Sequence, residues 1–329
     1  MFDIPIVLFM FRRTSGFRSI IEQIKKVRPQ KMYLIADGPR NDSEIQECND
    51  CRRFVENLID WNCEIVRNYA KTNRGVLENI GFGARWVFEH EEKAIFLEDD
   101  NYPEDSFFMY CKELLNKYEE EERVLWICGT NYITDMKLET SYVFTQHLLP
   151  CGWASWSKKF LRYYDAELTS LQDQGKLRTF KNSYDNKKLM KQQLRSVERT
   201  KYLIETDRRK SSWDYQMIYS LRANNLLGIA PTKNQIKNIG ADNFSVHGGT
   251  STKLVMTDRF CLVNTAKISF PLIHPDNIEV NCSFEKKIGD IILLPLSERL
   301  KNIAGTIAKK VLRMNKNESF AEYLKKMRY

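Results

Sequence analysis

Residues 94–100 read Ala-Ile-Phe-Leu-Glu-Asp-Asp, four apolar residues followed at once by three carboxylates. The apolar run has the length of a strand that is buried on both faces, which is typical of a parallel sheet. Three consecutive carboxylates repel one another unless a cation lies between them. Hard oxygen ligands at the end of a buried strand suit Mg²⁺ or Mn²⁺ held against a phosphate, and the plain alternative is an acidic turn in solvent.

Strands and helices alternate on both sides of this stretch. Apolar runs predict strands over 5–11, 32–36, 64–66, 94–97 and 124–128, and apolar residues at helical spacing predict helices between them. Apolar strands separated by amphipathic helices indicate an α/β fold, a mostly parallel sheet with helices on both faces. Ligands bind such sheets beyond the carboxyl ends of the strands. Arg12-Arg13, Asp37-Gly38 and residues 98–100 stand at three of these ends.

The composition excludes several classes of protein. With 329 residues, 43% of them hydrophobic and 29% charged, the chain is not disordered, and no apolar run approaches the length of a membrane span. No signal peptide is expected, so the eight cysteines are expected to be reduced thiols in the cytoplasm. The formal charge is +8, but nine Lys/Arg and three Glu place +6 of it in residues 297–329. The nearly neutral remainder argues against nucleic-acid binding.

The second half of the chain is predicted in less detail. Residues 162–209 are polar and Lys-rich and indicate a helical insertion, followed by a helix over 213–221 and a strand over 226–230. A single apolar stripe with Lys and Arg beside it then predicts an amphipathic helix; its members are Leu296, Leu300, Ile303, Ile307, Val311 and Met314. Three roles remain open for this helix: it lies on an anionic membrane, packs on the domain, or mediates dimerisation.

Four motifs occur in an order that resembles the GT-A-fold glycosyltransferases, family 2-like and inverting, over roughly residues 4–250. Glu98-Asp99-Asp100 is similar to the acidic motif of that family, and 151–156 to its glycine loop. Trp213-Asp214-Tyr215 is similar to the motif of the catalytic base, and His247, after Asn238-Ile239-Gly240, to a late histidine. Asn73 and Gly75, with Asn79, are similar to a further NxG stretch.

The resemblance implies a role for each matching residue. Asp100 and His247 would hold Mn²⁺ or Mg²⁺, Asp99 would contact the ribose, and Glu98 would support the nucleoside side. Asp214 would be the catalytic base, although it could instead cap the helix that begins there. The remaining donor-binding residues that it implies are Arg12, Asp37, Asn73, Gly75, Gly152 and Trp153. Trp153 and Trp156 could stack on a sugar or lie in the core.

We therefore predict a metal-dependent, inverting glycosyltransferase. It would move a hexosyl or N-acetylhexosaminyl group from a nucleoside-diphosphate sugar, UDP being expected, to a hydroxyl of a glycan or lipid-linked saccharide in polysaccharide biosynthesis. Residues 1–250 would form the catalytic domain, with 162–209 as the acceptor region, and 251–329 a C-terminal extension with the basic amphipathic helix. The enzyme is expected to be cytoplasmic, with peripheral attachment to the inner face of the cell membrane and oligomer formation both open.

Two alternatives belong to other classes of protein. A nucleotidyltransferase that makes nucleotide sugars would share the sheet and the acidic site, but it needs a Gly-rich loop with a Lys after the first strand. Residues 11–16, Phe-Arg-Arg-Thr-Ser-Gly, do not fit that loop. A non-catalytic binding protein on a degenerate transferase fold would be expected to have lost the acidic cluster or the base, and both are present.

Overall fold

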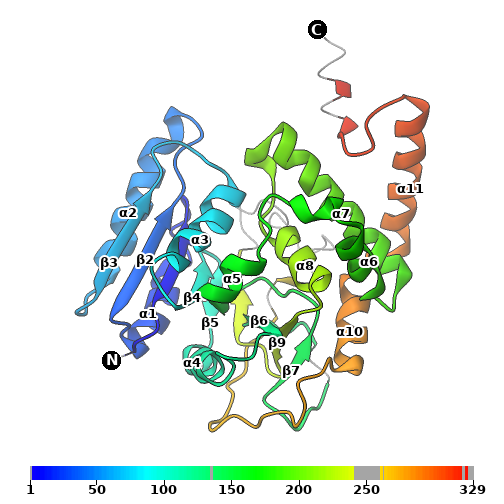
Figure 1. Ribbon diagram of the computed structural model, residues 1–329. Helices are drawn as coiled ribbons and strands as arrows, with labels where there is room; N and C mark the ends of the chain where they lie inside the picture. Colours follow the sequence, from blue (N-terminus) through cyan, green and yellow to red (C-terminus); the bar gives the residue numbers. More distant parts are fainter. Residues whose placement is uncertain (1, 134–135, 241–259, 262, 321–322, 325–329) are drawn as a thin grey trace.

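The computed structural model describes residues 2–133, 136–240, 260–261, 263–320 and 323–324, and its centre is an eight-stranded sheet (Figure 1). The strands lie in the order β3-β2-β1-β4-β8-β6-β9-β7. They are β1 (Ile6–Met10), β2 (Lys31–Ala36), β3 (Glu64–Tyr69), β4 (Lys93–Glu98), β6 (Val124–Cys128), β7 (Tyr142–Thr145), β8 (Trp153–Trp156) and β9 (Leu227–Pro231). The strands β3, β2, β1 and β4 are parallel, as are β6 and β9, while β8 and β7 run antiparallel to their neighbours.

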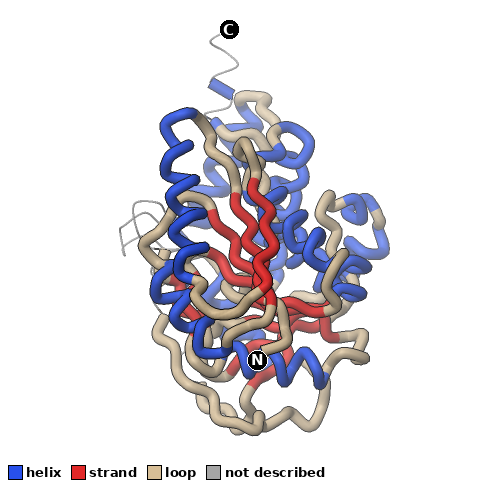
Figure 2. The backbone as a smooth tube through the Cα atoms, turned by 90° about the vertical axis from the view of Figure 1, so that its left-hand side faces the viewer, coloured by secondary structure: helices blue, strands red, loops and turns tan. Residues whose placement is uncertain are grey.

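Helices cover both faces of the sheet, as Figure 2 shows with the strands between two helical layers. One layer consists of α1 (Phe17–Val27), α2 (Ile45–Leu58) and α4 (Phe107–Lys117). The other contains a π-helical turn (Leu77–Phe82), α3 (Gly83–Phe88), α5 (Ser157–Tyr163) and α8 (Asp214–Ala223). The predicted α/β class, with its mostly parallel sheet and two helical layers, is confirmed.

Two hydrophobic cores follow from the alternation of side chains along each strand. In β1, Val7 and Phe9 belong to the core under α3, α5 and α8, whereas Ile6, Leu8 and Met10 belong to the core under α1, α2 and α4. All five side chains are buried. A strand without a polar face can only lie in the middle of a two-sided sheet, so the sequence of β1 places it there.

The structure corrects the expectation for residues 151–156. Only Cys151 and Gly152 form a loop, because Trp153–Trp156 is the strand β8, inserted antiparallel between β4 and β6. Two neighbouring strands satisfy its backbone groups, which allows four residues to form a central strand. The short strands β5 (Asn101–Pro103) and β10 (Ile236–Asn238) were also not predicted, and they pair antiparallel with each other beyond the end of β4.

The predicted helical insertion is confirmed. It consists mainly of α6 (Gln174–Asn182) and α7 (Lys187–Thr206), with short 3₁₀ turns at Thr169–Gln172 and Arg208–Lys210. Asp173 caps α6 by accepting hydrogen bonds from two backbone N–H groups, and Asn186 caps α7 in the same way. Both helices pack against α8.

The C-terminal part contains α10 (Cys282–Ile292) and α11 (Leu296–Val311). Ile268, Leu272, Phe284 and Ile288 are buried in the two cores, so residues between 263 and 292 pack on the sheet domain. The expected division at residue 250 lies outside the described residues and stays a prediction. Within the described chain, no helix combines the length and the apolar character that crossing a membrane requires.

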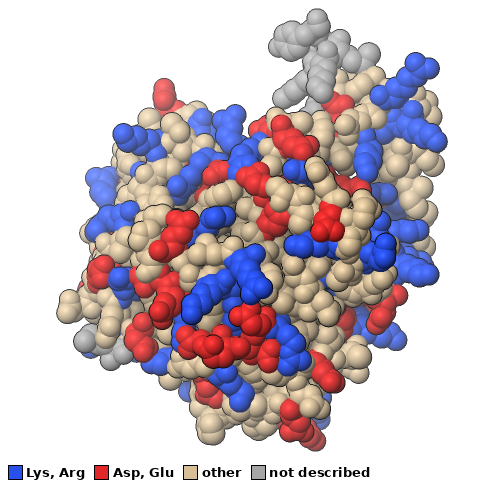
Figure 3. Space-filling view, in the orientation of Figure 1, with Lys and Arg blue, Asp and Glu red and all other residues tan. Residues whose placement is uncertain are grey.

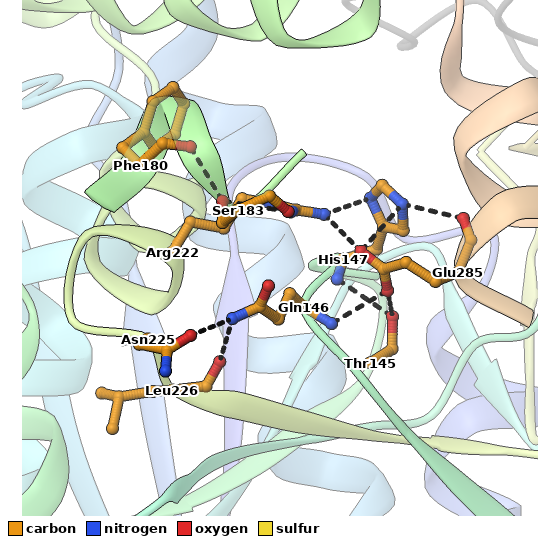
Figure 4. Close-up of polar contacts among 9 residues, drawn as sticks. All are labelled: Thr145, Gln146, His147, Phe180, Ser183, Arg222, Asn225, Leu226 and Glu285. Atoms are coloured by element: carbon orange, nitrogen blue, oxygen red, sulfur yellow. Dashed lines mark hydrogen bonds and ion pairs between the residues drawn. The ribbon is translucent and has the colours of Figure 1, made fainter. Parts of the chain in front are cut away.

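A buried polar cluster joins α10 to the sheet domain (Figure 4). It is centred on Glu285, which accepts hydrogen bonds from Thr145 Oγ1 at 2.6 Å, from the Gln146 N–H at 3.0 Å and from Arg222 Nη2 at 2.6 Å. Arg222 Nη2 also lies 3.1 Å from His147 Nδ1, and His147 Nε2 lies 3.1 Å from the Glu285 carbonyl oxygen. We refer to these five residues as the Glu285 cluster.

Candidate functional site

The carboxyl ends of β1, β2 and β4 meet at one edge of the sheet, and the three acidic residues lie there. Asp99 Oδ1 accepts a hydrogen bond from Arg13 Nη1 at 2.7 Å, and Arg13 Nη1 is 3.6 Å from Asp100 Oδ2. Asp100 also accepts from Asn101 Nδ2 at 2.6 Å and from Asn238 Nδ2 at 3.2 Å. The segments after β1 and β4 are thus joined to β10 through these carboxylates.

Two glycines allow the backbone to approach the acidic residues closely. A Cβ atom on Gly240 would lie 2.4 Å from Asp100 Oδ2, and one on Gly16 would lie 2.9 Å from the Asp99 carbonyl oxygen. No side chain fits at such distances. The sequence Asn238-Ile239-Gly240 therefore closes one side of the acidic site, with Asn238 as a donor and Gly240 as the point of contact.

Two carboxyl groups at this edge have raised pKa values. Burial raises the pKa of Glu98 well above its usual range, and the charges of Asp100, Asp99 and Asp214 raise it further. Burial also raises the pKa of Asp100, against the opposing effect of Arg13. We call Glu98, Asp99, Asp100 and Asp214 the acidic edge. A bound cation would relieve the repulsion that these pKa shifts express.

Asp214 is the first residue of α8. Its Oδ1 accepts a hydrogen bond from Ser212 Oγ, and Ser212 Oγ in turn accepts one from the Tyr215 N–H at 3.4 Å. The serine, rather than Asp214, thus meets a backbone N–H at the start of the helix. Tyr164 fixes the same turn, since its hydroxyl donates to the Trp213 carbonyl oxygen at 2.9 Å. These contacts favour the base over the capping alternative for Asp214.

Asp37, at the end of β2, organises the predicted Asn73–Gly75 stretch. Its carboxylate accepts hydrogen bonds from Asn73 Nδ2 at 2.8 Å, from the Arg74 N–H at 2.8 Å and from the Gly75 N–H at 3.1 Å. Gly75 has a φ of +84°, and a Cβ there would lie 2.5 Å from the Arg209 carbonyl oxygen. The sequence grouped Asn73 with Gly75 and named Asp37 separately. The structure joins the three in one hydrogen-bonded unit.

Gly152 lies beside the acidic edge, with a φ of +58°. Its N–H donates to Asn101 Oδ1 at 2.8 Å, so Asn101 connects Gly152 with Asp100.

Trp153 does not face the site. Its ring stacks between the ring of Phe96, at a centroid distance of 3.8 Å, and that of Trp126, at 4.0 Å. With both ring faces covered, the core alternative fits Trp153, and the ring is not a platform for a sugar. Trp156 is buried as well.

Arg12 does not lie with the acidic edge, and Arg13 does. Arg12 Nη1 is 3.2 Å from Glu44 Oε1 and 3.1 Å from Glu47 Oε2, both in the region of α2. The chain bends at residues 11–12, directly after β1, and the two arginines diverge there. The sequence placed both arginines at the end of the first strand. The resemblance implied that Arg12 contacts the donor, but the structure pairs Arg12 with glutamates of the α2 region. Contact of Arg12 with a nucleotide stays a prediction.

The donor set of the acidic edge suits a divalent cation. His247 lies outside the described residues, and the described ones contain no group of three His, Cys, Asp or Glu side chains placed to hold a metal ion. Mg²⁺ and Mn²⁺ ions at phosphate sites take only one or two protein carboxylates and complete their shell with phosphate and water. Asp100 and Asp99 fit that requirement.

Four residues of the site were missed or given no role in the sequence. Arg13 and Asn238 stood within quoted motifs, and Asn101 follows the three carboxylates directly. Arg74 lies between Asn73 and Gly75, and its guanidinium donates to Asn79 Oδ1 at 2.7 Å and to Asn68 Oδ1 at 3.1 Å. In the sequence, only their position beside a motif pointed to these four residues. Such a position does not show which neighbouring side chain faces the site.

Comparison with known proteins gives no relative in sequence, because neither a protein-family model nor a curated protein matches the chain. Solved structures share part of its backbone. GalNAc-T7 with UDP, GalNAc and Mn²⁺ overlaps at 13% identity and a TM-score of 0.37, covering 51% of this chain and 38% of that one. This chain thus spans less than half of the length of GalNAc-T7.

Two further structures overlap more widely. The structure of S. aureus TarS overlaps 74% of this chain and 62% of its own length, at 11% identity and a TM-score of 0.39. The mannosyltransferase PcManGT from Pyrobaculum calidifontis, in complex with GDP-Man and Mn²⁺, covers 67% and 68% at 10% identity and a TM-score of 0.38. Overlaps of this size add no weight to a functional argument. The fold class rests on the strand order of the chain itself: an α/β fold whose mostly parallel sheet and helical layers agree with the GT-A arrangement.

Proposed function

We propose that this protein is a metal-dependent, inverting glycosyltransferase that uses a nucleoside-diphosphate sugar, with UDP as the nucleotide. The observation that carries the proposal is the acidic edge. The charges of Asp99 and Asp100, which directly follow β4, and of Asp214 at the start of α8 raise the pKa of Glu98, the last residue of β4. A diphosphate leaving group with a divalent cation is the kind of ligand that such a site favours.

The donor would bind across the carboxyl ends of β1, β2 and β4. In the proposal, the unit of Asp37, Asn73 and Gly75 contacts the nucleoside, Asp99 the ribose, and Gly152 allows the backbone to approach the sugar. Asp100 would hold the cation, and a cation there would stabilise the charge of the departing diphosphate as a Lewis acid. Glu98 would support the nucleoside side of the site.

The acceptor would react at Asp214. Its carboxylate takes the proton of the acceptor hydroxyl while that oxygen forms a bond to the anomeric carbon, and the bond from this carbon to the diphosphate oxygen breaks. Attack from the face opposite the leaving group inverts the anomeric configuration. Ser212, which donates to Asp214 Oδ1, would keep the carboxylate oriented.

The finer parts of the proposal concern the substrates. The transferred group would be hexosyl or N-acetylhexosaminyl, and the acceptor a glycan or lipid-linked saccharide. The insertion of α6 and α7, which packs on α8 next to the proposed base, is the proposed acceptor region.

Thermal unfolding with UDP, GDP, CMP and ADP, each with and without Mn²⁺, tests the donor class. A nucleotide at a hundred times its dissociation constant adds about 2.7 kcal/mol of stability. We expect UDP to raise the unfolding temperature by several degrees, and only with Mn²⁺. Asp100→Ala should lose this shift. The absence of a shift with every nucleotide would contradict the proposal.

A second experiment tests inversion. Once a donor sugar is known, the anomeric configuration of the product can be read from proton coupling constants in NMR spectra. The proposal requires the configuration opposite to that of the donor. A product that keeps the donor's configuration would refute the role of Asp214 as a base that activates a direct attack.

A further inference from the structure

The helix α11 (Leu296–Val311) turns its apolar side away from the protein. Leu296, Leu300, Ile303, Ile307 and Val311 follow one another at intervals of three and four residues, so they form one stripe along the helix. Their exposed fractions lie between 51% and 76%. We call these five residues the α11 stripe. Contiguous apolar surfaces of this kind on soluble proteins mark places where another molecule binds.

The other side of α11 is the one that contacts the rest of the chain. Gly305 faces Phe320, since a Cβ there would lie 3.9 Å from its ring, and the Lys309 ammonium is 5.8 Å from the same ring centroid. Lys316, just after the helix, pairs with Glu198 of α7 at 2.6 Å. The five residues of the α11 stripe thus do not pack on the domain in this structure, whereas Met314, which the sequence counted with them, lies after the helix and is buried.

Basic side chains accompany the stripe on both of its borders. Lys301 and Lys310 are exposed, and Lys301 pairs with Glu298, the one acidic residue of the helix, at 2.8 Å. The sequence adds Arg299 and Arg313 within the same stretch, whereas Lys309 lies on the opposite side beside Phe320. Figure 3 shows blue side chains gathered along the right-hand edge of the molecule, where Figure 1 places α11. An exposed apolar stripe between cationic borders is complementary to a surface with anionic groups at the water interface and an apolar layer below them.

From this geometry we infer that α11 lies flat on an anionic lipid surface, with the α11 stripe inserted among the acyl chains and Lys301 and Lys310 at the head groups. At 16 residues the helix is about 24 Å long, which suits binding in the plane of the membrane. A second copy of the chain is a poorer occupant, because pairing two such helices brings basic borders against each other.

Vesicle flotation of the full chain tests the inference without any measurement of transferase activity, so the two proposals can fail separately. The protein is mixed with vesicles of phosphatidylcholine alone or of phosphatidylcholine and phosphatidylglycerol. We expect flotation with the vesicles that contain phosphatidylglycerol, weakened by salt, and little with the neutral ones.

Two double variants separate the stripe from the net charge. Ile303→Asp with Ile307→Asp places two carboxylates on the stripe, and Asn302→Asp with Thr306→Asp places two beside it on the same helix turns. All four side chains are exposed, so both variants should fold, which circular dichroism would check. The first pair should reduce vesicle binding at least about ten-fold, because buried charges oppose insertion, and the second should retain most of it.

Three results would overturn the inference. The first is a wild-type protein that floats with neither vesicle, because there is then no lipid binding to explain. Equal losses in both double variants would show that charge alone matters and that the stripe does not insert. The third is a dimer seen by sedimentation without lipid and dissociated by Ile303→Asp with Ile307→Asp, because the occupant would then be a second copy.

Discussion

Two half-buried carboxylates in this protein, Glu98 and Glu285, have pKa values that are shifted in opposite directions. At the acidic edge, burial and the neighbouring carboxylates raise the pKa of Glu98 well above its usual range. In the Glu285 cluster burial acts in the same direction, but the charge of His147 when it is protonated, the charge of Arg222 and the hydrogen bond from Thr145 outweigh it and lower the pKa of Glu285.

The opposite pKa shifts indicate different roles for the Glu285 cluster and the acidic edge. The Glu285 cluster joins β7, α8 and α10 through hydrogen bonds and an ion pair, so its charges serve the fold. At the acidic edge the neighbouring carboxylates raise the pKa of Glu98, so their repulsion opposes folding. A protein keeps such a region where a ligand supplies the missing positive charge.

The largest expected effect is on turnover in Asp214→Asn. Removal of a general base lowers the rate by about 10²–10⁴-fold. Since Asp214 also repels Glu98, the variant should unfold at the same denaturant concentration as the wild type or at a higher one. Steady-state kinetics with the donor identified by the nucleotide panel, together with urea unfolding, measures both quantities. Undiminished turnover would remove Asp214 from the proposed mechanism.

The comparison itself is tested by Glu285→Gln and Glu98→Gln, two matched neutral substitutions. Glu285→Gln leaves Arg222 buried without its carboxylate and should lower the free energy of unfolding by about 3–5 kcal/mol. Glu98→Gln removes repulsion and should leave that free energy unchanged or raise it at neutral pH. Urea unfolding of both variants decides the matter. Equal destabilisation would mean that the two carboxylates do not differ as described.

A smaller effect is expected from acid. Burial lowers the pKa of His147 to about 4 from an unfolded value near 6.5, so its neutral form is favoured in the folded state. The resulting stability is complete above pH 6.5 and is lost as the pH falls toward 4, by about 2–3 kcal/mol at pH 4.5. His147→Gln should unfold with a weaker pH dependence over this range. An unchanged pH dependence would place the titrating group elsewhere.

The smallest expected effect comes from Arg12→Ala. Arg12 pairs with Glu44 and Glu47 while remaining 24% exposed, and partly exposed ion pairs contribute little. The free energy of unfolding should fall by less than about 1 kcal/mol. If the unfolding shift with UDP and Mn²⁺ falls in this variant, the predicted contact of Arg12 with the nucleotide is supported; an unchanged shift would exclude it.

Much of the fold follows from the sequence because the strands β1, β2 and β4 are apolar on both faces and have no other place to lie. The strands β7 and β8 were missed, since four residues give too little periodicity to distinguish a strand from a loop. The packing of Ile268 and Leu272 was missed as well, because they lie in a segment without regular structure whose position depends on distant contacts.

The candidate site shows the same limit at the level of single residues. Asn73 and Gly75 were grouped by motif and Asp37 was named separately, and the structure brings the three together. The choice between Arg12 and Arg13 depends on a turn, and the fate of Trp153 depends on Phe96 and Trp126 from other strands. A sequence pattern identifies the neighbourhood of a site, whereas long-range packing selects the side chains that face it.

The most direct test of the central claim is Mn²⁺ binding measured by electron paramagnetic resonance, in which bound ions lose the signal of the free ion. Wild-type protein, Asp100→Asn and the exposed control Asp185→Asn are each titrated with Mn²⁺, with and without UDP. The acidic edge requires that UDP tighten Mn²⁺ binding in the wild type and the control, and that Asp100→Asn lose most of it. Equal binding by all three proteins would contradict the account.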